Sequence, residues 1–398
     1  MEDKLVLVTM TGPDRAGIIA AVAGCIAEAG ARIRDIEQSV AHTTASLSVL
    51  IELPDGMRDN KPLLKELLFR AKELGLDLDF EAVDPASYRL RQPGCTYVLT
   101  MLGTEVNAEA LTRVGATLAA DRVNIQRINK LTRGQLRCVE FAINVPEGLD
   151  IKELTRKLLN AGVGLGIDIA LQKENLYRRA KRLVVLDMDS TLIQVEVIDE
   201  LARLAGIGEQ VAQITHRAMN GELDFQQALR ERVALLKGLS SDALEAVYRA
   251  LPFTPGAKNL VRVLRQLGFK TAVISGGFNF FTDRLKQELG LDYAYANELV
   301  IEDGKVTGEV RGTIVDGQRK AELLEEIARR EGIALSQAIA IGDGANDLPM
   351  IGRAGLGIAF NAKARVREQA QYRINQPSLD SILYLLGIAE WEMAELEG

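Results

Sequence analysis

Hydrophobic and polar positions alternate in two distinct ways along the first 85 residues. The short runs at 4–10, 31–42, 44–53 and 76–83 are β-branched or alternate apolar with polar side chains, which is typical of strands with one buried face. Residues 16–30 and 61–75 instead carry apolar side chains at helical spacing, and Gly30 ends the first of these helices. The pattern predicts a βαββαβ unit, in which an antiparallel sheet carries two helices on one face.

The same order returns over residues 96–178, after a predicted linker at 86–95 that contains Pro93. The run TYVLTMLG matches LVLVTMTG, so that Gly103 follows Gly12 by 91 residues, and Gly115 follows Gly24 at the same offset. One offset across a strand and a helix indicates an internal repeat. The second copy is degenerate, because the turn GPDRAG at 12–17 becomes GTEVNA at 103–108.

Strands and helices alternate differently in the remaining residues, 179–398. Apolar strands at 183–186, 271–275 and 338–342 are separated by helical segments, which predicts a Rossmann-like parallel sheet with helices on both faces. The stretch from about 200 to 258 is predominantly helical and is predicted to form a small cap. The expected fold class is therefore α/β with a helical cap, preceded by two α+β domains.

Composition and charge limit the functions that this chain can have. Lysine and arginine number 48 against 55 aspartates and glutamates, so the net charge of −7 gives no general attraction to nucleic acid or anionic lipid. We expect neither as a partner. The three cysteines form no CxxC pair, and no run of 18 apolar residues occurs, which favours a cytoplasmic protein without a membrane span.

Acidic side chains follow the apolar strands of the third domain. The strand LVVL runs directly into Asp187 and Asp189, and AIAIG is followed by Asp343 and Asp347. Carboxyl ends of parallel strands are where ligands bind in open α/β sheets. Buried carboxylates repel one another unless a cation compensates, and magnesium prefers a few carboxylates together with a substrate phosphate. The sequence therefore predicts a Mg²⁺ and phosphate site at this edge.

Two further segments supply groups that suit phosphate oxygens. TAVISGG ends a strand with Ser275, Gly276 and Gly277, which offer a hydroxyl and unobstructed backbone N–H groups. Lys320 lies near the start of a predicted helix, where its ammonium would balance the carboxylates and hold a phosphoryl group.

The four pieces DMDST, SGG, Lys320 and GDGAND, in this order, resemble the motif set of the haloacid dehalogenase superfamily over residues 181–398. The resemblance implies that Asp187 is the nucleophile and Asp189 the general acid and base, with Lys320 on the phosphate. Asp187, Asp189 and Asp343 would hold Mg²⁺. Asp347 would have one of two roles. It would contact the residues that bind the metal without binding the metal itself, which is the interpretation that we prefer, or it would anchor Lys320.

Within that superfamily, the details of the predicted cap resemble the phosphoserine phosphatases. Glu196 follows the nucleophile loop, and the cap contains Met219, Phe225 and Arg232 in the arrangement that this family shows. The resemblance implies hydrolysis of O-phospho-L-serine to L-serine, the last step of serine biosynthesis, with Arg232 on the substrate carboxylate and Glu196 on its ammonium. Asn346 either reaches the phosphate or shapes its turn. The segment ALRERVALL contains two arginines, and either of them could instead lie on a solvent-exposed face of the helix.

The first unit resembles an ACT domain, a small ligand-sensing module with a GxDxxG turn between its first strand and first helix. The resemblance implies an amino-acid site at Gly12, Asp14 and Gly17, with Gly103 as the counterpart of Gly12 in the second copy. Backbone N–H groups at a helix N-terminus favour a carboxylate. The alternative is that these glycines only permit a tight turn and close packing. We expect a homodimer through the ACT-like domains, with L-serine as effector.

Two other functions remain open at this point. The core motifs define the chemistry, so the chain could act on another small phosphate ester as a phosphatase or phosphotransferase. It could also be an amino-acid sensor with a vestigial catalytic domain, although a dead copy has no physical reason to keep so many mutually repelling acids.

Overall fold

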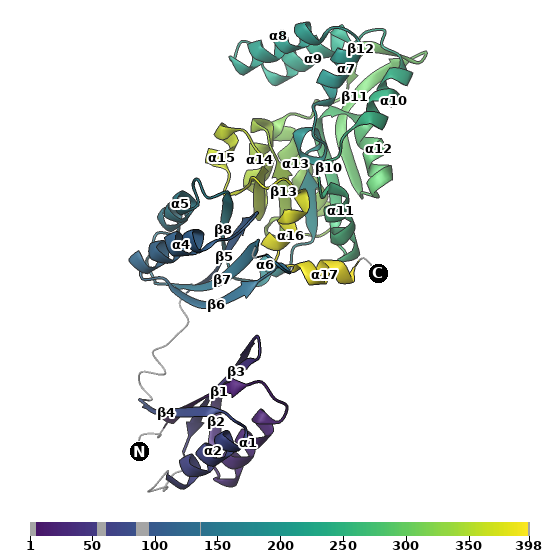
Figure 1. The fold of residues 1–398 in the computed structure, drawn as a ribbon. Helices are drawn as coiled ribbons and strands as arrows, with labels where there is room; N and C mark the ends of the chain where they lie inside the picture. Colours follow the sequence, from purple (N-terminus) through teal and green to yellow (C-terminus); the bar gives the residue numbers. More distant parts are fainter. Residues whose placement is uncertain (1–4, 54–60, 85–94, 136, 397–398) are drawn as a thin grey trace. The chain divides into compact units, whose positions relative to one another are not determined.

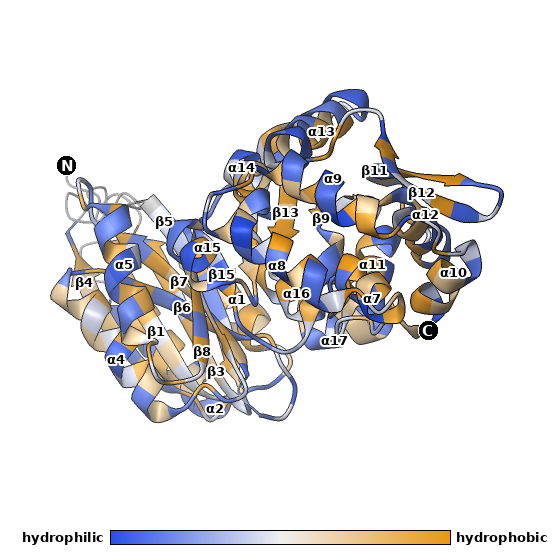
Figure 2. Ribbon diagram, turned by 90° about the horizontal axis from the view of Figure 1, so that it is seen from above, coloured by the Kyte–Doolittle hydropathy of each residue, from blue (hydrophilic) through white to orange (hydrophobic). Residues whose placement is uncertain are grey.

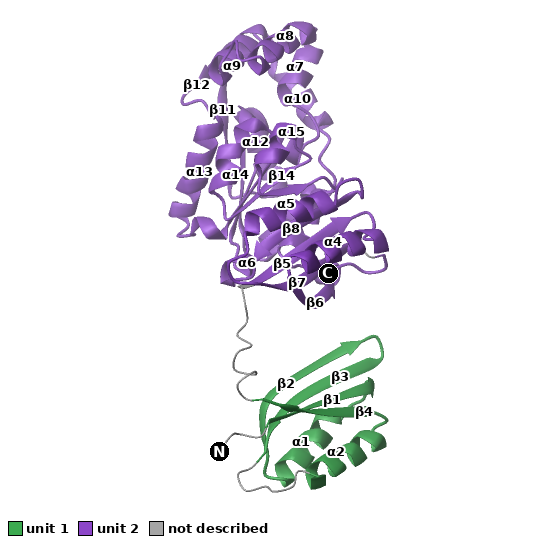
Figure 3. Cartoon of the chain, turned by 90° about the vertical axis from the view of Figure 1, so that its left-hand side faces the viewer, with its two compact units in different colours: residues 1–93 green, residues 94–398 purple. Residues whose placement is uncertain are grey.

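The computed structural model describes residues 5–53, 61–84, 95–135 and 137–396. The chain divides into two compact units, residues 1–93 and 94–398, which are coloured separately in Figure 3. Most of the predicted linker at 86–95 lies outside the described residues. Within the described residues, no helix is long and apolar enough to cross a membrane.

The first unit is a four-stranded antiparallel sheet in the order β2-β3-β1-β4 with two helices (Figure 1). Its elements are β1 (Leu5–Pro13), α1 (Ile18–Glu28), β2 (Arg32–Ala41), β3 (Thr44–Glu52), α2 (Lys61–Glu73) and β4 (Asp77–Val83). Alternate strand residues such as Val8 and Val49 pack with Val22 and Leu67 of the helices in one core. The period-2 pattern thus provides the buried face that the helices cover.

The second unit opens with the same arrangement, in the order β6-β7-β5-β8. Its elements are β5 (Cys95–Gly103), α4 (Ala108–Ala120), β6 (Asn124–Lys130), β7 (Cys138–Val145), α5 (Ile151–Ala161) and β8 (Ile167–Lys173). A Cβ on Gly12 would lie 2.9 Å from the carbonyl oxygen of Gly75, and a Cβ on Gly103 would lie 2.9 Å from that of Gly166. Both glycines therefore permit the same close approach of backbone in the two copies.

The rest of the second unit is built on a seven-stranded sheet in the order β12-β11-β10-β9-β13-β14-β15. Its strands are β9 (Leu183–Leu186), β10 (Lys270–Phe278), β11 (Tyr293–Glu302), β12 (Lys305–Arg311), β13 (Ala338–Gly342), β14 (Leu356–Phe360) and β15 (Tyr372–Ile374). Its pairings are parallel except for β11 with β12. The predicted fold class is confirmed.

Helices cover both faces of this sheet, and a further group of helices forms the cap (Figure 1). Those around the sheet are α6 (Leu176–Arg179), α11 (Ala257–Gln266), α12 (Asn279–Leu289), α13 (Gly317–Arg330), α14 (Leu348–Arg353), α15 (Ala364–Gln369), α16 (Ile382–Leu385) and α17 (Glu390–Glu395). The cap helices are α7 (Val197–Leu204), α8 (Gly208–Met219), α9 (Phe225–Leu235) and α10 (Ser241–Ala250). Short helical turns occur at Met188–Leu192, Leu335–Gln337, Ala345–Asp347 and Leu379–Ser381.

The central strands β9 and β13 are continuously hydrophobic because both of their faces are buried (Figure 2). Val184 and Leu186 belong to the apolar cluster on one face of the sheet, and Leu183 and Val185 belong to the cluster on the other. The fully buried strand β9 therefore ends directly before a polar residue, Asp187, which begins the loop that follows the strand.

The second α+β domain has an apolar core of its own and also packs against the α/β domain. Leu102, Cys138 and Ala170 lie in the same apolar cluster as the strands and helices of the larger domain. Asp168 at the start of β8 accepts hydrogen bonds from the backbone N–H of Asn375 at 2.7 Å and from Gln376 Nε2 at 2.9 Å. Both faces of this second sheet are thus occupied, one by its own helices and one by the α/β domain.

Candidate active site

The first strand of the α/β sheet delivers Asp187 to a buried position. The backbone N–H of Asp187 donates to Ile341 O at 2.9 Å, so that the end of β9 is fixed against β13. The N–H of Met188 donates to Asp187 Oδ1 at 2.7 Å. The chain then turns sharply, with Ser190 at a φ of 56°, in the left-handed region that few residues other than glycine adopt. This turn directs Asp189 back towards the cavity that Asp187 also lines.

Lys320 is completely buried and bridges two carboxylates. Its Nζ lies 2.7 Å from Asp187 Oδ1 and 2.7 Å from Asp347 Oδ1. The other oxygen of Asp347 accepts the backbone N–H of Gly344 at 2.9 Å. Burial lowers the pKa of Lys320, but the two carboxylates more than offset this and hold the pKa above its usual value. Asp347 is placed as the anchor of Lys320, which is the alternative that the sequence analysis ranked second.

Asp189 lies in a different environment from Asp187, although only one residue separates them. Its Oδ1 accepts the backbone N–H of Val197 at 2.9 Å, and its Oδ2 accepts Ser275 Oγ at 3.2 Å. Burial, and then the charge of Glu196, raise the pKa of Asp189 to about 7. A carboxyl group with this pKa can both give and take a proton near neutral pH.

The glycines at the end of β10 are held by a residue that the sequence analysis missed. Buried Asn297 on β11 donates its side-chain amide to the carbonyl oxygens of Gly276 at 2.7 Å and Gly277 at 3.1 Å. Its Oδ1 accepts the backbone N–H of Val315 at 2.8 Å. A Cβ on Gly277 would lie 3.0 Å from Asp189 Oδ2. The loop therefore has a fixed shape with little room for side chains.

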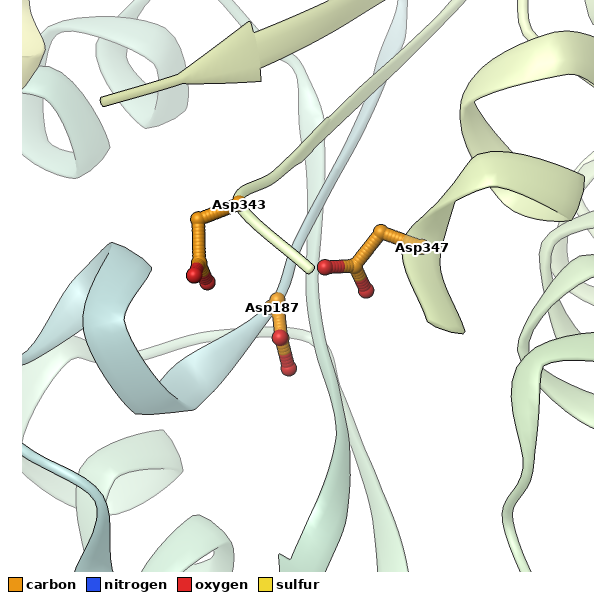
Figure 4. Close-up of side chains that lie close together, drawn as sticks. All are labelled: Asp187, Asp343 and Asp347. Atoms are coloured by element: carbon orange, nitrogen blue, oxygen red, sulfur yellow. The ribbon is translucent and has the colours of Figure 1, made fainter. Parts of the chain in front are cut away.

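Three carboxylates from two strand ends and the following turn lie close together (Figure 4). One oxygen from each of Asp187, Asp343 and Asp347 lies within 4.8 Å of the others. Burial, then the charges of Asp347 and Glu196, raise the pKa of Asp343 to about 6. Burial and the neighbouring charge of Asp347 likewise raise the pKa of Asp187 well above its usual value, although Lys320 opposes this. The single positive charge of Lys320 does not neutralise the negative charge of these three carboxylates.

The donor set fits a hard divalent cation held chiefly by two of these residues. Among the described residues, no hydrogen-bond donor reaches Oδ2 of Asp187 or Oδ2 of Asp343. Both oxygens of Asp347 are already engaged by Lys320 and Gly344. Oxygen ligands of this kind suit Mg²⁺. The side chain of Asp189 is not in the cluster, because the strand ends at Leu186 and the two residues no longer alternate as in a strand; its role as a metal ligand stays a prediction.

A cavity of about 100 Å³ lies over these carboxylates, beneath the cap. The predicted residues that line it are Asp187, Asp189, Glu196, Phe225, Arg232, Gly276, Asp343 and Asn346. Ser275 is fully buried and is not among the residues that line the cavity. Met219, at the end of α8, is 75% exposed and does not line the cavity. Lys363, which lines it after β14, was missed although it follows a strand end like the acids.

Arg232 is the only arginine among the residues that line this cavity, and its guanidinium is without an ionic partner. Its Nε donates to the carbonyl oxygen of Ala228 at 3.2 Å, within the same helix. No carboxylate in the described part of the chain lies within 4 Å of its nitrogens. Burial lowers the pKa of Arg232, while Asp199 and Glu196 oppose that shift. Glu196 itself accepts Ser190 Oγ at 3.0 Å. Besides the three aspartates, the cavity thus presents two cations, Arg232 and Lys363, and one further carboxylate, that of Glu196.

The predicted regulatory residues are not among those that line this cavity, and they belong to two domains. In the first unit, Gly17 has a φ of 94° and begins α1, and the exposed Asp14 donates its backbone N–H to Thr43 O at 2.9 Å. Gly12 packs closely against Gly75, as noted above. In the second copy, Asn107 caps α4 with its side chain instead of a left-handed glycine. The two helix starts therefore differ in shape.

Comparison with known proteins agrees with this architecture. Residues 184–352 match the haloacid dehalogenase-like hydrolase family, and residues 4–81 and 95–172 each match an ACT domain family. A solved HAD family hydrolase of Salmonella enterica has a TM-score of 0.65 and 32% identity, covering 73% of this chain and 98% of its own. The fold and site thus define a haloacid dehalogenase-like hydrolase with two ACT domains.

Relatives of nearly equal length narrow this class. The phosphoserine phosphatase of Streptomyces coelicolor is 43% identical over 97% of this chain and 93% of its own length. That of Mycobacterium tuberculosis is 40% identical over 98% and 94%, respectively. The chain belongs to the phosphoserine phosphatase family.

The raised pKa of Asp343 predicts a pH-dependent loss of stability without divalent cations. In the unfolded chain this carboxyl titrates near 3.9, so the unfolded state loses its proton first, and stability falls as the pH rises through about 6. Asp343→Asn cannot ionise and escapes this penalty of at most about 3 kcal/mol. In chelator at pH 7.5, the variant should unfold at a higher temperature than the parent, by a gap that narrows at pH 5.

Thermal unfolding followed by circular dichroism measures this gap, with exposed Asp303→Asn as the matched control. The control should unfold with the parent at every pH. A variant that is less stable than the parent in chelator at pH 7.5 contradicts the electrostatic interpretation.

Proposed function

We propose that the chain hydrolyses O-phospho-L-serine to L-serine and phosphate, the step that completes serine biosynthesis, in the cytoplasm. The observation that carries this proposal is the unpaired guanidinium of Arg232, which shares a small cavity with the carboxylate of Glu196. A zwitterionic amino acid needs one cation and one anion from its site. The names of the full-length relatives support the same substrate.

In this proposal, the cap fixes the amino-acid part of the substrate. Arg232 pairs with the carboxylate and Glu196 with the ammonium, while the ring of Phe225 closes one wall. A Cβ on Gly276 would lie 3.0 Å from Phe225 Cζ, so the glycine leaves space between the cap and the strand end. These contacts, remote from phosphorus, position the phosphate for in-line attack.

The proposed first step transfers the phosphoryl group to Asp187. A carboxylate oxygen of Asp187 bonds to phosphorus while the bond from phosphorus to the serine oxygen breaks, which gives an aspartyl-phosphate. Asp189 gives its proton to the departing serine oxygen, for which a pKa of about 7 is well suited. Lys320, at 2.7 Å from Asp187, holds positive charge beside the attacked phosphate.

In the proposed second step, Asp189, now ionised, takes a proton from water, whose oxygen attacks phosphorus. The bond to Asp187 breaks, phosphate leaves, and both carboxyl groups regain their starting states. Asp187, Asp343 and the loop at Asp189 would hold Mg²⁺, which supplies charge compensation for the carboxylates and the phosphate when bound.

The assignment of Arg232 predicts a change in substrate preference. Arg232→Ala should lower kcat/KM for O-phospho-L-serine at least 100-fold, because the carboxylate loses a charged hydrogen-bond partner in a buried site. O-Phosphoethanolamine, which lacks the carboxylate, should be affected less than threefold. The ratio of kcat/KM for O-phospho-L-serine to kcat/KM for O-phosphoethanolamine, measured by phosphate release with Mg²⁺, should therefore fall steeply.

Arg230→Ala is the matched control, since Arg230 lies on the exposed face of the same helix. It should leave the ratio unchanged. An unchanged ratio in Arg232→Ala contradicts the proposed substrate and favours the alternative of another small phosphate ester. A folded parent without activity on any phosphate ester would instead favour the sensor alternative.

We also propose that L-serine regulates the enzyme through the first ACT domain and that the chain forms a homodimer through its ACT domains. The support is the match of two segments to ACT domains and the left-handed Gly17 at the start of α1, where free N–H groups suit a carboxylate. The carboxylate of the exposed Asp14 could meet the ammonium.

The repeat supplies a matched pair of variants for this proposal. Asp14→Ala should raise several-fold the L-serine concentration that half-maximally changes turnover, with KM for O-phospho-L-serine unchanged, because the ammonium loses its counter-charge. Glu105→Ala alters the corresponding position of the second copy, at the offset of 91, and should have no effect. Equal L-serine responses in the parent and Asp14→Ala would remove this site from the account.

A further inference from the structure

A second, larger cleft lies at the opposite edge of the α/β sheet from the active site. It has a volume of about 870 Å³ and is lined by α5, by the end of β8 with α6, and by the segment from α15 to β15. Lys181, Ser336 and Gly355, which also line it, lie one or two residues before the strands β9, β13 and β14. Because the active site lies at the carboxyl ends of these parallel strands, the cleft at their amino ends is a separate site.

The lining of this cleft is strongly cationic, although the whole chain carries a net charge of −7. Its cationic side chains are Lys152, Arg156, Lys173, Arg178, Lys181 and Arg373, against Glu368 as the carboxylate that lines it. Arg156 pairs with Glu153, and Arg178 pairs with Glu140 and Glu174. The other four have no carboxylate within 4 Å among the described residues.

Two of these cations, Lys181 and Arg178, are buried, and of the two only Lys181 has no carboxylate partner among the described residues. Lys181 donates its Nζ to the carbonyl oxygen of Ser336 at 2.5 Å, and burial lowers its pKa to about 8. The Nε of Arg178 is buried without a hydrogen-bond partner. An uncompensated buried cation costs stability unless an anion meets it. The cleft therefore has the charge of an anion site, and one of its cations, Lys181, is buried without a counter-ion among the described residues.

We propose that this cleft binds a small phosphate-bearing anion as a site distinct from the active site. The four cations without carboxylate partners exceed what a single carboxylate ligand would neutralise, whereas a phosphate offers two charges and several acceptor oxygens. The volume is in the range of small-molecule pockets and exceeds that of the active-site cavity.

The fold connects this cleft to the catalytic residues through single strands. Lys181 and Asp187 lie at the two ends of β9, and Ser336 and Asp343 lie at the two ends of β13. At about 3.3 Å per residue, the six steps along the chain from Lys181 to Asp187 span about 20 Å. Ligands at the two sites therefore do not touch, and variants at one site can be examined without altering the other.

Binding of pyrophosphate to the full-length protein tests the proposal, measured by isothermal titration calorimetry. The titration is run in chelator, where the uncompensated carboxylates of the active site disfavour an anion. Lys152→Gln/Lys173→Gln removes two exposed charges from the cleft, and Lys65→Gln/Lys305→Gln removes two exposed charges elsewhere. Lys181→Met removes the buried charge and keeps a side chain of similar length.

We expect the cleft double variant to bind pyrophosphate at least tenfold more weakly than the parent and the control double variant to stay within twofold. Lys181→Met should also weaken binding at least tenfold, without a loss of thermal stability. Turnover of O-phospho-L-serine by the cleft double variant, without pyrophosphate, should equal that of the parent, so this test is independent of the proposed function. Affinities of parent and cleft double variant within twofold of each other, or no binding to the parent, would overturn the proposal.

Discussion

The ammonium of Lys320, shared between Asp187 and Asp347, is the interaction on which the active site depends. Burying several carboxylates together is costly, and their pKa values rise for that reason. One fully buried cation holds the first acid from β9 and the acid that follows β13, and so ties the two central strands together at their carboxyl ends. The negative charge that remains uncompensated is what makes the site receptive to a cation. The buried carboxylates thus lower the stability of the fold at this position, and they are also the groups that serve the chemistry of the site.

The short parallel strands determine where everything else lies. Because β9 and β13 are buried on both faces, charged side chains lie beyond their ends: Asp187 and Asp343 follow the two strands, and Lys181 precedes β9. The carboxyl ends hold the acids beneath the cap, and the amino ends face the second ACT domain, whose β8 lies beside β15. That domain is therefore part of the body that carries the active site, whereas the first ACT domain is a separate compact unit. The two copies of one fold differ in what covers the outer face of their sheets.

Local signals in the sequence were sufficient for the secondary structure, the repeat and the strand-end acids, because each depends on residues close together in the chain. Asn297 was missed because its partners lie about twenty residues away, on β10 and in the segment before α13. Asp347 was ranked as support for the metal ligands, since only the fold shows that Lys320 reaches it. The docking of the second ACT domain was not predicted, because β8 has Asp168 and Gln172 among its apolar residues, and only the fold shows that both are buried against the α/β domain. Met219 was placed by resemblance alone, and the structure shows it exposed.

The central claim is that Asp187 carries the phosphoryl group during turnover, and trapping that intermediate tests it most directly. The protein with Mg²⁺ is mixed with O-phospho-L-serine labelled on phosphorus and quenched in acid within milliseconds, and the labelled peptide is identified by mass spectrometry. The account predicts label on the peptide that contains Asp187, and neither label nor phosphate release in folded, magnesium-replete Asp187→Asn. Label on another residue, or phosphate release by Asp187→Asn at near the parent rate, would contradict it.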